Sequence, residues 1–297
     1  MSKKVVRKAV IAAAGFGTRL LPQTKAMPKE MMPLVDKPII QHIVEELVEA
    51  GIEDIVIVTG YHKRSIEDHF DNMSADLRQN LKLNGKLELL EQTKKISDLA
   101  NFAYIRQKGP YGTATPVMNA AHLIGDEPFI YTFADDIVLA QPSRFKQMIA
   151  LYEEFGSTIV PCIRARSEKD YERYGILNGE FIRKDVLKMS GLVEKPGRAK
   201  APSDLACAGG YLLTPDVLPY IEKGKKLVNK TQEFYMTTYA LQPMIADGKS
   251  LYGCLINNST YYDTGNKLDY LKTVVEFALK HEDIKKDFRA YLQDLIK

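Results

Sequence analysis

A glycine-containing segment directly after an apolar run constrains this chain more than any other feature. The run Val5–Ala13 leads into Ala-Ala-Gly-Phe-Gly-Thr-Arg-Leu-Leu-Pro, residues 13–22, and Lys29 follows ten residues after Arg19. Glycines let backbone N–H groups approach phosphates because no Cβ stands in the way. Arg19 and Lys29 are cations of the kind that neutralise charge on a leaving pyrophosphate. The order of strand, glycine turn, arginine and distant lysine therefore predicts a nucleoside triphosphate site.

Other interpretations of this segment fit less well. A Rossmann dinucleotide fingerprint requires a third glycine where the chain has Leu20, and an acidic residue at the end of the second strand, where it has Gly60 and Tyr61. A Walker-type loop requires Gly-Lys-Ser/Thr, which does not follow. The basic N-terminus resembles the start of an export signal, but the apolar run before Gly15 spans only about six residues, fewer than the ~7–15 such a signal needs. We therefore expect a cytoplasmic protein.

The composition argues against several classes of partner. The 297 residues carry 41 basic and 38 acidic side chains, a net charge of +3, which gives no reason to expect nucleic acid or an anionic membrane as a partner. No apolar stretch approaches the length of a membrane span. Cys162, Cys207 and Cys254 form no Cys-x-x-Cys pair, so neither zinc nor a disulfide framework is indicated. We interpret them as inert core thiols.

Short β-rich runs alternate with amphipathic helical patterns, which predicts an α/β fold with a mostly parallel central sheet. The expected strands are Val5–Ala12, Ile55–Thr59, Phe102–Gln107, Phe129–Phe133, Thr158–Cys162, Val186–Lys195, Cys207–Leu213 and Leu251–Ile256. The expected helices are Pro38–Ala50, Thr115–Leu123, Arg144–Phe155, Phe234–Asp247 and Lys267–Lys280.

Two segments stand apart from this alternation. Residues 71–101 are rich in charge, and we expect a helical excursion there that is either solvated or serves as a lid or subunit contact. The tail carries Ile284, Phe288, Leu292 and Ile296 at a spacing of four, which predicts a C-terminal helix over 281–297. Such a stripe packs on its own domain or against a partner subunit.

An acidic pair, Asp135 and Asp136, follows the apolar run Phe129–Phe133. Carboxylates at the carboxyl end of a strand face the ligand crevice of an α/β sheet, and Mg²⁺ binds through one or two carboxylates plus substrate phosphates. Taken alone, such a pair is more typical of a turn cap. Together with the phosphate-binding segment it favours a metal site.

The segment 13–22 and the stretch Lys-Ala-Met-Pro-Lys-Glu-Met-Met-Pro-Leu-Val-Asp-Lys-Pro, residues 25–38, resemble the signature of sugar-1-phosphate nucleotidylyltransferases. The second stretch is most similar to bacterial UTP–glucose-1-phosphate uridylyltransferases, also called UDP-glucose pyrophosphorylases. The likeness extends from about Lys8 to Leu279. It implies a Rossmann-like three-layer nucleotidyltransferase fold, with a catalytic domain over 1–280, and the conversion of UTP and glucose 1-phosphate to UDP-glucose and pyrophosphate. We also expect a homodimer or homotetramer.

The resemblance implies a role for each matching residue. It places Arg19 and Lys29 at the leaving pyrophosphate, Lys195 of a Val-Glu-Lys-Pro motif at the sugar phosphate, and Mg²⁺ on Asp135 and Asp263. The implied nucleotide-binding residues are Ala13, Ala14, Gly15, Gly17, Gln107 and Gly112. The implied sugar-binding residues are Gly175, Glu194, Gly209 and Glu233.

Two stretches depart from the family pattern. Residues 112–116 read Gly-Thr-Ala-Thr-Pro where the family commonly has Gly-x-Gly-His-Ala, and residues 232–238 read Gln-Glu-Phe-Tyr-Met-Thr-Thr where it has Gly-Glu-Ile-Gln-Leu-Thr-Asp. In addition, Gln107 can pair with an imide edge that uracil and thymine share. A related enzyme that uses dTTP or another sugar 1-phosphate therefore stays open, as does a non-catalytic nucleotide-sugar sensor. The intact phosphate and metal residues favour an enzyme.

Overall fold

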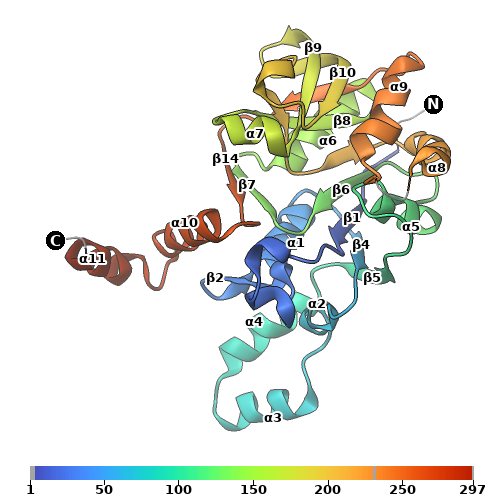
Figure 1. Ribbon diagram of the computed structural model, residues 1–297. Helices are drawn as coiled ribbons and strands as arrows, with labels where there is room; N and C mark the ends of the chain where they lie inside the picture. The colour runs from blue at the N-terminus through green and yellow to red at the C-terminus, as the bar shows by residue number, and fades with distance from the viewer. Residues whose placement is uncertain (1–3, 230–231, 296–297) are drawn as a thin grey trace.

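Strands and helices alternate along the chain in the computed structural model, which describes residues 4–229 and 232–295 (Figure 1). The strands are β1 (Lys8–Ala13), β2 (Pro33–Leu34), β3 (Lys37–Pro38), β4 (Asp54–Thr59), β5 (Asn101–Arg106), β6 (Phe129–Phe133), β7 (Asp136–Ala140), β8 (Ile159–Arg164), β9 (Gly175–Arg183), β10 (Val186–Glu194), β11 (Leu205–Cys207), β12 (Tyr211–Leu213), β13 (Tyr252–Leu255) and β14 (Ser259–Asp263). The α-helices are α1 (Ile39–Glu49), α2 (Arg64–Phe70), α3 (Ala75–Leu83), α4 (Leu87–Ser97), α5 (Thr115–Ile124), α6 (Arg144–Phe155), α7 (Glu168–Arg173), α8 (Val217–Leu227), α9 (Gln242–Ala246), α10 (Lys267–Ala278) and α11 (Lys285–Leu295). Short 3-10 turns are η1 (Thr18–Leu20), η2 (Gln23–Lys25), η3 (Lys29–Met31) and η4 (Arg198–Lys200), and η5 (Thr237–Leu241) is a π-helical turn.

One large sheet forms the centre of the molecule, with the strand order β11-β9-β10-β13-β8-β12-β6-β1-β4-β5. Strands β6, β1, β4 and β5 are parallel, and Ala9 of β1 lies in register with Ile55 of β4 and Ile130 of β6. Beyond β12 the pairs are antiparallel, apart from β13 on β8. The predicted α/β fold is confirmed, but the sheet is parallel mainly where helices connect its strands, because a tight connection such as β9 to β10 joins antiparallel neighbours.

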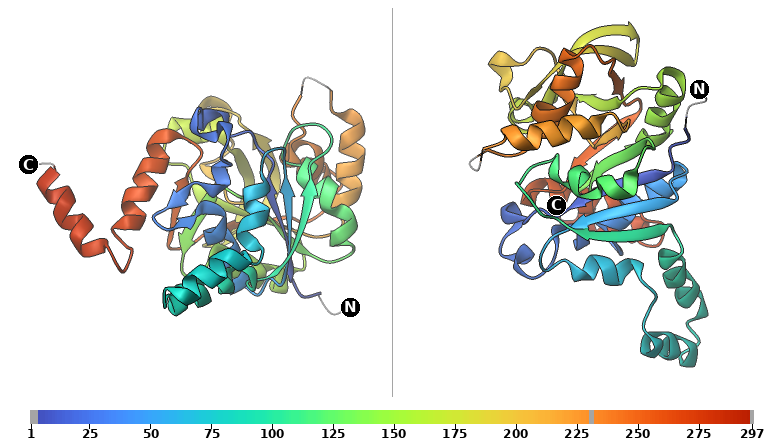
Figure 2. Two further views of the ribbon diagram at one scale, coloured as in Figure 1. Left: turned by 90° about the horizontal axis from the view of Figure 1, so that it is seen from below. Right: turned by 90° about the vertical axis from the view of Figure 1, so that its right-hand side faces the viewer.

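Helices cover both faces of the sheet, which gives the three layers that the family resemblance implies (Figure 2). Along β1, Ala9 and Ile11 belong to a core shared with α1 and α6, whereas Val10 belongs to a core shared with α5 and α8. Side chains alternate between the two faces of a strand, so an apolar run such as β1 is buried on both sides. Burial on both sides explains why the first strands are continuous hydrophobic runs in the sequence.

Two predicted elements have different bounds in the structure. The strand expected over Cys207–Leu213 is divided into β11 and β12 at Gly209 and Gly210, which have φ angles of 82° and 116°. The helix expected from Phe234 begins only at Thr237, because the backbone of Phe234 is hydrogen-bonded to Tyr111 and Ala114 instead. The sequence carried no expectation for strands β2, β3, β7, β9 and β14 or for helices α2, α7 and α8.

A separate two-stranded ribbon carries the acidic residues of the predicted metal site. Strands β7 and β14 pair in antiparallel fashion, with Asp136 opposite Asp263. The hydroxyl of Thr264 donates a 2.7 Å hydrogen bond to the backbone oxygen of Asp135. This ribbon therefore brings two acidic motifs that are far apart in the sequence to one place.

Two parts of the molecule project from the body (Figures 1 and 2). Helices α3 and α4 form the predicted excursion within 71–101, and α11 extends beyond α10 with none of its described residues buried. The tail stripe thus forms a helix as predicted, although Ile296 lies outside the described residues. The division into a catalytic domain over 1–280 and a helix over 281–297 stays a prediction. None of the helices among the described residues is long and apolar enough to cross a bilayer.

Candidate active site

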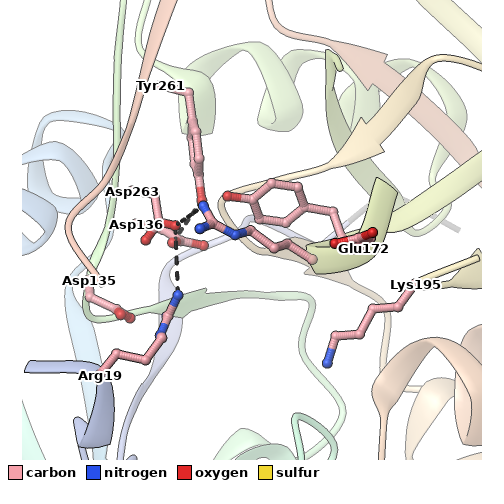
Figure 3. Close-up of a pocket in the computed structure, with 9 residues that line it drawn as sticks. Arg19, Asp135, Asp136, Glu172, Lys195, Tyr261 and Asp263 are labelled. Atoms are coloured by element: carbon pink, nitrogen blue, oxygen red, sulfur yellow. Dashed lines mark hydrogen bonds and ion pairs between the residues drawn. The ribbon is translucent and has the colours of Figure 1, made fainter. Parts of the chain in front are cut away.

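A cavity of about 330 Å³ opens beside the β7–β14 ribbon (Figure 3). Its lining combines acidic, basic and tyrosine side chains: Arg19, Asp135, Asp136, Glu172, Arg173, Tyr174, Lys195, Tyr261 and Asp263. Four residues singled out in the sequence, Arg19, Asp135, Lys195 and Asp263, are therefore brought together from four separate motifs.

Lys29 approaches the site from η3 and is held by Asp135. Its Nζ donates a 2.5 Å hydrogen bond to Asp135 Oδ2. Burial lowers the pKa of Lys29, but the charges of Asp135 and Glu30 outweigh it and leave the pKa above its ordinary value. Burial likewise raises the pKa of Asp135, and Lys29 more than reverses this, so the pKa stays below its usual range. Both groups are thus charged at neutral pH.

The second proposed ligand, Asp263, is surrounded by cations. Arg173 donates to its Oδ2 at 3.2 Å, and Arg19 Nη1 lies 3.9 Å from the same oxygen. On the ribbon opposite, Asp136 accepts a 2.9 Å hydrogen bond from the hydroxyl of Tyr261. Burial, together with the charges of Asp135 and Asp263, raises the pKa of Asp136 to about 7. The site therefore holds the charged carboxylate of Asp135 beside Asp136, whose carboxyl group titrates near neutrality.

The glycine turn is packed closely against its neighbours. A Cβ on Gly15 would lie 3.7 Å from Lys29 Nζ, which places the turn beside the lysine. Gly17 has a left-handed backbone with φ of 66°, and its oxygen accepts a 2.7 Å hydrogen bond from Thr24. Ala13 ends β1, and Ala14 lies against Gly60, whose Cβ would be 3.1 Å from the oxygen of Ala14.

Glu194 ends β10 on the other side of the cavity, and Lys195 directly follows it. Lys195 has a φ of 46°, a left-handed conformation that is strained for a residue with a side chain. Its Nζ donates to the hydroxyl of Tyr235 at 2.8 Å and lies 3.7 Å from Glu194 Oε1. Glu194 Oε2 accepts a 2.6 Å hydrogen bond from Thr237, and a Cβ on Gly175 would be 3.3 Å from the same oxygen. Three residues of the predicted sugar side therefore meet here.

The predicted base loop is joined to the segment around Glu233. The backbone N–H of Phe234 donates a 2.6 Å hydrogen bond to the backbone oxygen of Tyr111. The backbone N–H of Ala114 donates a 2.9 Å hydrogen bond to the backbone oxygen of Phe234. Gly112 lies between these bonds, with a φ of 134° and no room for a Cβ. The two stretches that depart from the family pattern are thus in direct contact. We call this contact, residues 111–114 with 234–236, the loop seam.

Glu233 lies apart from the other predicted sugar residues. It lines a second cavity of about 820 Å³, together with Phe16 and Tyr111. Gln107 directly follows β5, and its backbone N–H donates a 2.8 Å hydrogen bond to the backbone oxygen of Thr59. Gly209 stands behind the ribbon, where a Cβ would be 2.4 Å from the buried side chain of Arg144.

Comparison with known proteins identifies the family. The family model described as Nucleotidyl transferase matches residues 8–279. The chain belongs to this family. A nucleotidyl transferase family member named UTP–glucose-1-phosphate uridylyltransferase YngB, of Bacillus subtilis strain 168, is 43% identical over 296 residues, which is 99% of this chain and 97% of that protein.

Solved structures agree with this assignment. A UDP-glucose pyrophosphorylase complexed with UDP-glucose is 35% identical, with a TM-score of 0.81 over 93% of this chain and all of that chain. A UTP-bound UGPase from Acinetobacter baumannii is 31% identical, with a TM-score of 0.86 over 98% of this chain and all of that chain. The resemblance found in the sequence and the nucleotidyltransferase fold are both confirmed.

Some residues of the cavity were missed by the sequence analysis. Glu172 and Arg173 end α7 just before Gly175, an implied sugar-binding residue, so their proximity to it was an available signal. Tyr261 precedes Asp263 by two residues on β14, and residues two apart on a strand share a face. Once β14 was known, the predicted position of Asp263 at the site also indicated Tyr261 as a residue of the same site.

Proposed function

We propose that this nucleotidyl transferase family member forms UDP-glucose and pyrophosphate from UTP and glucose 1-phosphate. The observation that carries the proposal is the convergence of Arg19, Lys195, Asp135 and Asp263 on one cavity, with Lys29 paired to Asp135. The names of the relatives reported above, and the UDP-glucose and UTP of two solved structures, support the choice of substrates. Homo-oligomer formation and a cytoplasmic location remain part of the proposal.

In the proposed reaction a phosphate oxygen of glucose 1-phosphate attacks the α-phosphorus of UTP. A new P–O bond forms, the bond from the α-phosphorus to the bridging oxygen breaks, and pyrophosphate leaves with that electron pair. No side chain forms a covalent intermediate, so catalysis rests on alignment and charge stabilisation. Arg19 and Lys29 stabilise the leaving pyrophosphate, and Lys195 holds the attacking phosphate. Each such preorganised charge contact contributes about 10²–10³ in rate.

Asp135 and Asp263 fit a bound Mg²⁺. Both are carboxylates on the wall of one cavity. Mg²⁺ takes one or two protein carboxylates and completes its shell with substrate phosphates and water. When held by these residues, Mg²⁺ would supply positive charge that offsets the charge of the substrate phosphates.

The remaining predicted residues define the two substrate sides. Ala13, Ala14, Gly15 and Gly17 offer backbone N–H groups to the triphosphate. Gln107 and Gly112 form the base side. Glu194 and Gly175 form the hexose side at the cavity. Gly209 and Glu233 stay proposed sugar residues, although they lie behind the ribbon and on the second cavity. The hydrogen bond from Thr237 to Glu194 supports a carboxylate fixed to accept hydroxyl groups of the sugar.

A second candidate function is the use of dTTP in place of UTP. Ala114 and Thr115 stand where relatives carry glycine and histidine, and both are completely buried. The Thr115 hydroxyl donates to the oxygen of Pro110 at 2.5 Å, so these side chains act on the base only through the loop. One methyl group distinguishes the two bases, and a pocket discriminates a methyl by roughly 10–200-fold. We therefore expect a preference for UTP within that range.

Pyrophosphate release tests the proposed function. The wild-type chain and an Asp135→Asn variant are assayed with Mg²⁺, UTP or dTTP, and a panel of sugar 1-phosphates. We expect release with UTP and glucose 1-phosphate in the wild type only. Faster release with dTTP, or with an N-acetylhexosamine 1-phosphate, would replace the proposed substrate. No release with any pair, while UDP-glucose still binds, would identify a non-catalytic sensor.

A further inference from the structure

A buried ion pair lies directly behind Lys29. Lys63 Nζ donates to both carboxylate oxygens of Glu30, at 2.6 and 2.8 Å. The side chain of Glu30 is fully buried and that of Lys63 is 7% exposed. Neither residue is among those that line the active-site cavity, and nothing in the reaction described above uses them. Burial of two charges is unfavourable unless their geometry is good. We therefore ask whether this pair contributes to function in addition to stability.

The local backbone connects this pair to Lys29. Lys29 and Glu30 are consecutive residues of η3, a 3-10 turn. With three residues per turn, consecutive side chains point about 120° apart. When Glu30 faces Lys63, Lys29 is therefore turned away from the pair, toward Asp135 at 2.5 Å. Lys63, Glu30, Lys29 and Asp135 form a series of alternating charges that runs from the interior to the cavity wall.

The loop that carries Lys63 also supports the glycine turn. It follows β4 directly, and Ala13 of β1 lies in register with Thr59 of β4. Gly60, the first residue of the loop, is packed on Ala14, where a Cβ would be 3.1 Å from the backbone oxygen. His62 adopts a left-handed φ of 61°, a conformation that costs energy for a residue with a side chain. One strained loop thus contacts both nucleotide-side elements, the glycine turn and η3.

The charges explain what Lys63 prevents. Glu30 acts on the pKa of Lys29 in the same direction as Asp135, so both carboxylates attract the Lys29 ammonium. Lys63 occupies both oxygens of Glu30 and leaves Lys29 to Asp135. Burial raises the pKa of Glu30 and Lys63 opposes this, so without Lys63 the Glu30 carboxylate keeps its charge only by drawing the Lys29 ammonium away from Asp135.

We propose that Lys63 is a positioning residue for nucleotidyl transfer, which acts through Glu30 to hold Lys29 on Asp135 at the edge of the cavity. The proposal rests on the proposed function for the reaction that it affects. The arrangement of Lys63, Glu30 and Lys29 does not depend on which sugar or base is used.

The test combines kinetics with a crystal structure. The variants are Lys63→Met, Lys63→Arg and the double variant Glu30→Gln/Lys63→Met, and Leu151→Ala serves as a control. Leu151 is buried on α6 and does not line the cavity, and its truncation destabilises the protein by an amount similar to a broken buried pair. For each variant, kcat, the KM of UTP and of glucose 1-phosphate, and Tm are measured.

We expect Lys63→Met to lower kcat about 100-fold, the loss typical of a catalytic group displaced by about 1 Å, with the KM of glucose 1-phosphate changed less than about threefold. Lys63→Arg keeps the charge and should retain most of kcat. The double variant removes the competing carboxylate and should regain at least about tenfold over Lys63→Met. Leu151→Ala should lower Tm but leave kcat unchanged. A folded Lys63→Met with wild-type kcat, or an equal loss of kcat in Leu151→Ala, overturns the proposal.

A crystal structure separates this proposal from the proposed function. In Lys63→Met the Lys29 ammonium should leave Asp135 for Glu30, and in the double variant it should return. If the wild-type chain releases no pyrophosphate, the function fails, and the position of Lys29 in these crystals still decides the role of Lys63. Should Lys63→Met not fold, Lys63→Gln removes the charge while keeping a hydrogen-bond donor. An unchanged contact between Lys29 and Asp135 in that variant overturns the proposal.

Discussion

The loop seam gives the most quantitative prediction, through the substitution Gly112→Ala. A Cβ on Gly112 would lie 2.4 Å from the nitrogen and from the oxygen of Phe234, and 2.5 Å from its carbonyl carbon. Ordinary contact begins at 3.4 Å, so the two backbones must separate by about 1 Å. The nitrogen and the oxygen of Phe234 are each hydrogen-bonded across the seam. The N–H donates to Tyr111, and the oxygen accepts from Ala114. Neither backbone can move without weakening these bonds.

The cost follows from these contacts. Two backbone hydrogen bonds contribute about 1 kcal/mol each, and a residue with a side chain at φ of 134° is strained by about 1–3 kcal/mol. We therefore expect Gly112→Ala to lower the free energy of unfolding by about 3–5 kcal/mol. Tm should fall by roughly 10 °C. Because the seam joins the base loop to the segment of Glu233, kcat/KM should fall about 100-fold for both substrates.

The matched control is Gly85→Ala in the α3–α4 excursion. Gly85 also has a positive φ, of 68°, but a Cβ there meets nothing within 4 Å. It should therefore show backbone strain alone, with unchanged kcat/KM. Thermal unfolding and steady-state kinetics of the two variants decide the matter. Equal losses in both would refute the argument from close approach at the seam.

Further predictions concern charge. Asp135→Asn and Asp263→Asn should each lower kcat about 10²–10³-fold with Tm retained, and near-normal Mg²⁺-dependent turnover in either folded variant would contradict their role as ligands. Lys195→Ala should mainly raise the KM of glucose 1-phosphate, whereas Lys29→Ala should mainly impair chemistry on the nucleotide side; an effect of Lys195→Ala on UTP dependence alone would reverse this division. Burial raises the pKa of Glu46 from 4.5 to about 7. The folded state then binds its proton more tightly, so this contribution to stability is complete below pH 4.5 and is lost as pH rises to about 7. The difference between a pKa of 4.5 and one of about 7 corresponds to roughly 3 kcal/mol of unfolding free energy. Glu46→Gln should flatten the unfolding free energy between pH 5 and 8, and an unaltered slope would argue against burial as its source.

The parts of the fold that could be predicted are those with a local signal. Strands β1, β4 and β6 are apolar on both faces, so each stands out as a hydrophobic run. The β7–β14 ribbon has no such signal, because it depends on pairing between residues as distant as Asp136 and Tyr261, 125 positions apart. Tertiary contact also delays the start of the helix expected from Phe234 until Thr237, because the backbone bonds of Phe234 go to the loop seam.

The candidate site shows the same division. Motifs indicated Arg19, Lys29 and Lys195, and these residues do meet at or beside one cavity. Lys63 was not indicated, because nothing in its neighbourhood in the sequence shows that it reaches Glu30. A sequence pattern identifies groups that touch substrate more readily than groups that act on them from behind.

The β7–β14 ribbon also has a consequence for biosynthesis. Asp263 joins the cavity only when β14 pairs with β7. Asp136 and Tyr261 of this ribbon are 125 positions apart. At a synthesis rate of about 5–20 residues per second, roughly 6–25 s separate the two strands on the ribosome. During that interval the glycine turn and the first acidic pair have been made, but the proposed metal site still lacks Asp263.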